Sequence, residues 1–129
     1  MKTPNPGHPI TIEDNPNRIR VVLGGFIIAE TTEALTLREA SLPPVQYIPR
    51  KDARMDLLDP TTHRSHCPYK GDASYFTASA GGMVVENAVW TYERPFDSAD
   101  RIAGYLAFYP EKVDAIEEFT DEKTAATGR

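Results

Sequence analysis

The sequence contains only one cysteine, Cys67, among its 129 residues. A single thiol excludes an intrachain disulfide and a zinc site built from several cysteines, so we expect no metal and no cofactor. The chain also lacks an apolar run long enough to cross a bilayer, and prolines follow its first residues in place of an apolar signal segment. These absences predict a cytoplasmic protein without a membrane partner, stabilised by packing.

Basic clusters are missing as well. The 14 Lys and Arg residues are outnumbered by 19 Asp and Glu, the net charge is -5, and the one adjacent basic pair is Arg50-Lys51. A protein that follows the phosphates of a nucleic acid needs a basic stripe, so we expect no nucleic-acid partner. What is present, 40% hydrophobic and 26% charged residues in a chain of one-domain length, predicts a single folded core.

Composition divides the chain into three regions. Residues 1–17 carry prolines at positions 4, 6, 9 and 16, which interrupt helices and strand ladders, so we expect an extended proline-rich arm. Residues 117–129 are polar and end in small side chains, which predicts a polar tail. Residues 18–116 are then expected to form the single domain.

Two diglycine turns are the strongest local signals. Gly24-Gly25 and Gly81-Gly82 each separate two runs rich in β-branched residues, and glycine supplies the positive φ angles of a tight hairpin turn. We therefore expect hairpins over residues 18–30 and 74–92. Both faces of the first hairpin are largely apolar, which predicts cover on both sides, and residues 34–38 are expected to continue it as a three-stranded meander.

The turns also predict which residues pair. Leu23 should face Phe26 across the first turn, and Ala80 should face Met83 across the second. Because side chains alternate along a strand, the second hairpin should have a core face and an amphipathic face. The core face carries Phe76, Ala78, Val85 and Val89, and the amphipathic face includes Tyr75 and Trp90.

Shorter elements complete a mainly β fold with one or two short helices. Residues 45–48 predict a short strand that Pro49 ends, and residues 105–109 predict a buried strand. Residues 50–58 predict one or two helical turns. The stretch 59–73 is rich in Asp, Pro, Thr, Ser and Gly, which predicts a loop.

The predicted loop contains the most reactive side chains, His63, His66, Cys67 and Lys70. A metal site is disfavoured because adjacent His66 and Cys67 rarely converge on one ion. A nucleophilic Cys67 would need a nearby base and a lowered pKa, which Lys70 or a histidine could supply. The alternative is that Cys67 is a small buried anchor that fixes the loop, and both interpretations stay open.

The aromatic residues also allow two interpretations. Large rings usually fill the core of a small domain. If Tyr75 and Trp90 instead line an open face, they would form the apolar wall of a small-molecule pocket, with His66 and Lys70 as its polar groups.

Several of these residues carry a resemblance to a known family. The block His-Cys-Pro-Tyr-Lys-Gly-Asp-Ala-Ser-Tyr over 66–75, together with residues 52–58, 88–92 and 107–109, resembles the bacterial domain-of-unknown-function family number 427. The resemblance implies that family's β-tent-like fold, in which antiparallel sheets meet at an angle. This chain lacks the cysteine pairs of the related zinc-binding tent domains, so a metal-free version is implied.

The family has also been labelled nucleotidyltransferase-like. The Gly-Ser and Asp-x-Asp constellation expected of such enzymes is missing here, so we expect no such activity. No other catalytic constellation is recognisable, which leaves open whether the protein is an enzyme. The resemblance places emphasis on eight positions: Arg54, His66, Cys67, Lys70, Tyr75, Trp90, Tyr92 and Tyr109.

The leading hypothesis is a module that binds a small molecule or a peptide terminus. Trp90 and Tyr75 would form the wall of its pocket, and Arg54, His66 and Lys70 would orient an anionic or polar ligand. One alternative is an enzyme that uses Cys67 or His66 in covalent or acid/base catalysis. Another is a structural domain that forms a homodimer or larger homo-oligomer through its ring-rich face.

Overall fold

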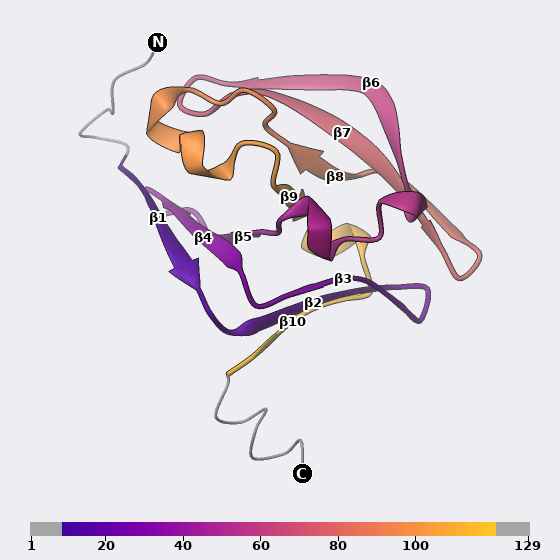
Figure 1. Cartoon of the computed structure of the whole chain (residues 1–129). Coiled ribbons are helices and arrows are strands. Elements are labelled where there is room, and N and C mark those ends of the chain that lie inside the picture. Colours follow the sequence, from indigo (N-terminus) through magenta and orange to yellow (C-terminus); the bar gives the residue numbers. More distant parts are fainter. Residues whose placement is uncertain (1–8, 121–129) are drawn as a thin grey trace.

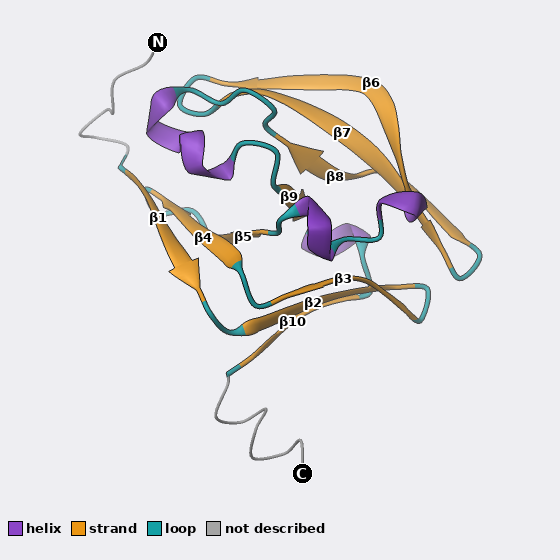
Figure 2. Ribbon diagram, in the orientation of Figure 1, coloured by secondary structure: helices purple, strands orange, loops and turns teal. Residues whose placement is uncertain are grey.

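Strands make up most of the computed structural model, which describes residues 9–120. The strands are β1 (Ile10–Asn15), β2 (Arg18–Leu23), β3 (Phe26–Thr31), β4 (Ala34–Glu39), β5 (Val45–Tyr47), β6 (Leu58–Cys67), β7 (Gly71–Ala80), β8 (Met83–Thr91), β9 (Leu106–Phe108) and β10 (Ala115–Phe119). Short 3-10 segments connect them: η1 (Arg50–Asp52), η2 (Met55–Leu57), η3 (Asp97–Ile102) and η4 (Pro110–Lys112). Figure 2 shows that these helical segments lie in the connections. The predicted mainly β class is confirmed.

The strands form three antiparallel sheets, in the orders β1-β4-β5, β10-β2-β3 and β6-β7-β8-β9. In Figure 1 the four-stranded sheet forms the upper layer, and β2, β3 and β10 form the lower one. Side chains between these two layers make one core cluster, including Val21, Ile28, Phe76 and Val89. A second cluster joins the four-stranded sheet to β4 and β5. The four-stranded sheet thus packs against both of the others.

Both predicted hairpins are present with the expected register at their turns. Leu23 pairs with Phe26, and Ala80 pairs with Met83. The two turns touch one another, and Figure 1 shows them on the same side of the molecule. The prediction that the first hairpin is covered on both faces is wrong near its turn, because Phe26 and Ile27 are exposed.

The predicted meander is also wrong. β4 pairs with β1 and β5 and not with β3. β1 lies inside the predicted arm. Pro9 and Pro16 lie just outside residues 10–15, so the ladder of these residues with β4 stays intact. β10 pairs with β2 and crosses the predicted domain boundary at residue 117. The rest of the predicted arm and tail, residues 1–8 and 121–129, lies outside the described residues.

The predicted loop over residues 59–73 is wrong too, because it is largely β6 and the start of β7. β6 is an edge strand, and most of its side chains are exposed. An edge strand needs neither a buried face of alternating apolar residues nor every backbone N–H, so polar residues and Pro60 are tolerated. The predicted helical turns over 50–58 are confirmed as η1 and η2.

In the part of the chain that the structure describes, no helix is both long and apolar enough to cross a membrane.

Candidate functional site

Five aromatic side chains of the second core cluster form an aromatic cluster: Tyr47, Tyr75, Trp90, Tyr92 and Tyr109. Tyr75 and Trp90 are cross-strand neighbours on β7 and β8. The ring centroids of Trp90 and Tyr109 are 4.5 Å apart, and the Tyr47 and Trp90 rings meet edge to face at 6.2 Å. Tyr75 and Tyr109 stack with nearly parallel planes. The structure therefore brings together the four rings that the sequence singled out and adds Tyr47.

Hydrogen bonds fix the orientation of these rings. The indole N–H of Trp90 donates to the Tyr47 hydroxyl at 3.2 Å. The Tyr75 hydroxyl lies 2.7 Å from Ser65 Oγ and 3.3 Å from the Tyr109 hydroxyl. The Trp90 indole and the Tyr47 phenol are both packed in the cluster, so the hydrogen bond between them holds the indole in one orientation.

Burial changes the chemistry of the tyrosine hydroxyls. Loss of solvent raises the pKa of Tyr47, which also accepts the Trp90 hydrogen bond. Burial likewise raises the pKa of Tyr92 and of Tyr109. Removal from water disfavours the charged phenolate, so these hydroxyls are neutral at physiological pH. The cluster can donate and accept hydrogen bonds but supplies no charge of its own.

One face of Trp90 opens into a pocket of about 240 Å³ where all three sheets meet; we call it the Trp90-walled pocket. Residues from each sheet contribute to it: from β2 and β10, from β5 and its neighbours, and from β8 and β9. The first residue of η4 completes the lining. Among the described residues that line it, Gln46 is the one with a polar amide side chain, and none is charged. Its lining residues are Val21, Pro44, Val45, Gln46, Ile48, Trp90, Phe108, Pro110 and Ile116.

Lys70 does not reach this pocket. Its ammonium group forms an ion pair with the Glu39 carboxylate, and both side chains are buried. Its backbone is fixed as well, since Lys70 O accepts from the Phe96 N–H at 2.9 Å. Cys67, a free thiol, is partly buried and packs against the same cluster. Lys70 therefore joins two sheets and lies outside the Trp90-walled pocket.

His66 lies on the outer face of β6. Its Nδ1 is 2.6 Å from Asp72 Oδ1, across the ladder between β6 and β7, and its side chain is 59% exposed. Consecutive side chains of a strand point to opposite faces, so His66 points away from the face on which Cys67 packs. The structure does not bring His66 and Cys67 together as a base and a nucleophile.

Arg54 also lies apart from the aromatic cluster. Its guanidinium makes two hydrogen bonds to the Asp56 carboxylate, at 3.0 and 2.8 Å. The bond to Arg54 lowers the pKa of Asp56. Arg54 lines a shallow hollow beside β3 that includes Ile27 and Glu30. The expected polar trio of Arg54, His66 and Lys70 is therefore not assembled around Trp90.

Three residues that shape this region were not predicted from the sequence: Tyr47, Gln46 and Glu39. The alternation of the predicted strand 45–48 was the available signal for Tyr47, because it places Val45 and Tyr47 on one face. Glu39 had no local signal, since its partner is Lys70 on another sheet. Within residues 9–120, no group of three or more His, Cys, Asp or Glu side chains is placed to hold a metal ion.

Two comparisons with known proteins bear on identity. The family model described as "Domain of unknown function (DUF427)" matches residues 11–118, which is nearly all of the described chain. No curated protein matches the sequence.

Proposed function

Since the chain belongs to the family described as "Domain of unknown function (DUF427)", we propose a function from its geometry: it is a binding module for a small, uncharged, ring-sized molecule. The observation that carries this proposal is the partly buried Trp90, whose indole forms the wall of an apolar pocket where three sheets meet. Pockets of this kind, with few polar groups, are typical of small-molecule sites.

The pocket lining favours an apolar ligand. Val21, Ile48 and Phe108 are almost fully buried and form its base. Pro44 and Pro110 are exposed and lie at its rim. An apolar cavity of about 150 Å³ already holds a benzene molecule. The pocket volume of about 240 Å³ therefore suits one ring with a short substituent.

Gln46 gives the ligand a direction. Its Oε1 accepts hydrogen bonds from Asn15 Nδ2 at 3.0 Å and from Thr36 Oγ1 at 2.8 Å. These contacts identify Oε1 as the acceptor, so the amide nitrogen of Gln46, a lining residue of the pocket, carries the donors that a ligand can use. A ligand with one hydrogen-bond acceptor, such as a hydroxyl or carbonyl oxygen, matches this arrangement.

The pocket is also largely preformed. Trp90 is held by the Tyr47 hydroxyl and by contact with the Tyr109 ring. A wall that is already ordered loses little conformational entropy when a ligand binds, which favours affinity for small molecules. The anionic ligand of the earlier hypothesis is not supported, because Arg54, His66 and Lys70 are paired elsewhere.

Trp90 is the single tryptophan of the chain, so its indole N–H gives one side-chain signal in a ¹H–¹⁵N spectrum. The test is a titration with 2-phenylethanol, compared with phenylacetate and phenethylamine as charged analogues. We expect a saturable shift of the indole signal with the alcohol. We expect binding to weaken by about tenfold or more with either charged analogue, because none of the described lining residues carries a charge that could pair with it.

Two arginine variants make the test specific. Ile116→Arg places a charge at the pocket rim and should weaken binding about tenfold or more. The matched control is Val84→Arg, at an exposed position near the start of β8, which should leave binding unchanged. The proposal is wrong if the indole signal does not move, if Ile116→Arg binds like the unmodified protein, or if phenylacetate binds as tightly as the alcohol.

A further inference from the structure

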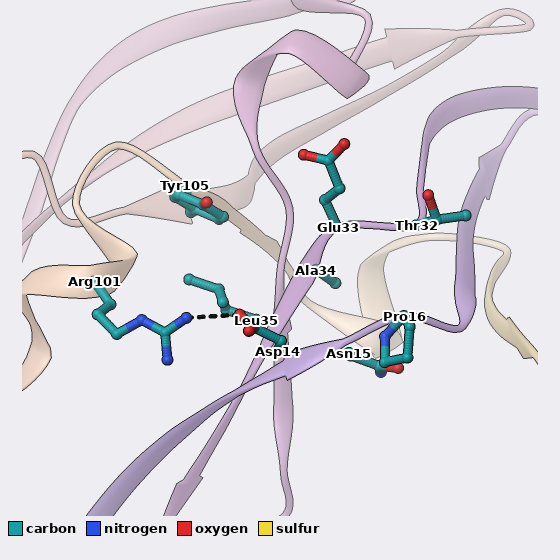
Figure 3. Close-up of a pocket in the computed structure, with 9 residues that line it drawn as sticks. All are labelled: Asp14, Asn15, Pro16, Thr32, Glu33, Ala34, Leu35, Arg101 and Tyr105. Atoms are coloured by element: carbon teal, nitrogen blue, oxygen red, sulfur yellow. Dashed lines mark hydrogen bonds and ion pairs between the residues drawn. The ribbon is translucent and has the colours of Figure 1, made fainter.

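A second pocket, of about 380 Å³, lies where the end of β1, the start of β4 and the segment around η3 meet (Figure 3). It shares no lining residue with the Trp90-walled pocket. We call it the charged pocket. Its lining residues are Asp14, Asn15, Pro16, Thr32, Glu33, Ala34, Leu35, Arg101 and Tyr105.

Arg101 is the basic group of the charged pocket. Its Nη2 lies 2.6 Å from Asp14 Oδ1, and its Nη1 donates to the Ile12 carbonyl at 3.0 Å. These contacts anchor the guanidinium across β1, as the dashed line in Figure 3 shows for Asp14. An arginine side chain has five N–H donors in a planar fork. Arg101 therefore keeps donors for a ligand while its position stays fixed.

Glu33 is the acidic group on another wall of the pocket (Figure 3). Its backbone N–H is bonded to Thr31 Oγ1 at 2.9 Å, which fixes the turn before β4. Its carboxylate lies 3.1 Å from Lys51 Nζ, and 62% of its side chain is exposed. A carboxylate can accept several hydrogen bonds, so Glu33 can bind a ligand ammonium group without giving up Lys51.

The remaining surface is apolar. Ala34 and Leu35 are 1% and 5% exposed and form the floor. The ring of Tyr105, which packs against the aromatic cluster, faces the space between Arg101 and Glu33 in Figure 3. An aromatic face attracts a cation as well as apolar groups.

Three charged side chains line this pocket. Asp14 and Glu33 are acidic and Arg101 is basic. Asp14 pairs with Arg101, and Glu33 pairs with Lys51, which lies outside the lining and also pairs with Asp52. A wholly apolar ligand would remove these groups from water without compensation, and a ligand with one charge would leave the groups of the same sign without a partner in it. A zwitterion supplies a partner of each sign.

We infer that the charged pocket binds a small zwitterion with the chemistry of a free amino acid. The ligand carboxylate binds the free donors of Arg101, and its ammonium group binds Glu33 beside the Tyr105 ring. Its side chain packs on Leu35. This inference does not depend on the function proposed for the Trp90-walled pocket.

The test uses L-leucine as the probe in a ¹H–¹⁵N titration of the full chain. We expect saturable shifts of the backbone signals of Ala34 and Leu35, with the Trp90 indole signal unmoved. N-acetyl-leucine lacks the ammonium group and leucine amide lacks the carboxylate, so each should bind at least about tenfold more weakly. Because these analogues change only the ligand, they test both charges without altering the protein.

Variants then assign the charges. Arg101→Gln and Glu33→Gln should each weaken leucine binding about tenfold or more. Arg101→Lys keeps the charge and loses the fork, so it should bind weakly even if Arg101→Gln folds poorly. Arg38→Gln, which breaks an exposed pair with Glu13 elsewhere on the sheet, is the control and should bind normally.

Three results would overturn the inference. Leucine could leave the Ala34 and Leu35 signals unchanged at millimolar concentration. Leucine amide could bind as tightly as leucine, which would identify a site for simple cations. Glu33→Gln could bind leucine like the unmodified chain, which would remove the assigned ammonium partner.

Discussion

Lys70 and Glu39 form a buried ion pair, with 10% and 9% of their side chains exposed. Glu39 ends β4 and Lys70 lies in the turn between β6 and β7, so the pair joins two sheets. A buried charge is tolerated when it has a charged partner. Lys70 is therefore a structural residue, although its sequence context suggested a ligand contact.

Replacing Lys70 with methionine should destabilise the protein by about 3–5 kcal/mol, because it removes the positive charge that neutralises the buried Glu39 carboxylate. Adding Glu39→Gln removes that charge and should recover part of the loss. Urea unfolding followed by circular dichroism measures both variants. Arg54→Met breaks an exposed pair with Asp56 and serves as the control, with an expected midpoint close to that of the unmodified chain. A Lys70→Met variant as stable as the unmodified chain would show that the Lys70–Glu39 pair does not stabilise the fold. The hypothesis that Lys70 contacts a ligand would then be restored.

The contact between the hairpin turns gives a second prediction. A Cβ atom on Gly24 would lie 2.2 Å from the carbonyl oxygen of Ala80, whereas one on Gly25 would meet no atom within 4 Å. Both glycines have positive φ angles, so each alanine variant carries backbone strain of about 1–2 kcal/mol. Gly24→Ala must also push the second hairpin away. We expect its thermal midpoint to lie clearly below that of Gly25→Ala, and equal midpoints would show that the turns do not touch.

Tyr47 predicts a dependence of stability on alkaline pH. Burial raises its folded-state pKa above the ordinary value of about 10, so the unfolded chain loses this proton first. The contribution is complete below pH 10 and falls as the pH rises above it, by up to about 1.4 kcal/mol per pH unit. Unfolding free energies of Tyr47→Phe should therefore decline less steeply above pH 10 than those of the unmodified chain. Identical slopes would contradict the raised pKa.

The packing of Cys67 predicts that its thiol reacts slowly in the folded protein. Its thiol is partly buried against the aromatic cluster, and His66 points to the opposite face of β6. A water-soluble disulfide reagent should modify the folded protein at least about tenfold more slowly than the urea-unfolded chain, as expected of a packed thiol. Equal rates would restore the hypothesis of a nucleophilic Cys67.

The sequence predicted best what adjacent residues determine. The turns Gly24-Gly25 and Gly81-Gly82 specify their hairpins through backbone angles that glycine adopts without strain, and both registers are correct next to the turns. Farther along, a bulge shifts each register, so Val21 pairs with Ala29 and not with Ile28 as the turn alone predicts. β6 was not predicted, because this edge strand has no alternating apolar face. β1 was not predicted, because the prolines at both of its ends favoured an extended arm over a strand.

The candidate site was predicted in part for similar reasons. Tyr75 and Trp90 share a face of one hairpin, so strand alternation placed them together. Lys70 and its partner are 31 residues apart in the chain, and no local pattern connects them. His66 and Arg54 pair with acidic residues close by in sequence, Asp72 and Asp56, and these local pairs hold both side chains away from Trp90.

β6 affects how the protein behaves when it is concentrated. An open strand edge can template pairing with a neighbouring molecule and so begin aggregation. Here Pro60 lacks a backbone donor, Arg64 carries a charge, and a break in the ladder between them interrupts the regular spacing. These features of β6 disfavour the addition of a strand from a second molecule to the sheet. The same polar residues are the reason that the sequence predicted a loop there.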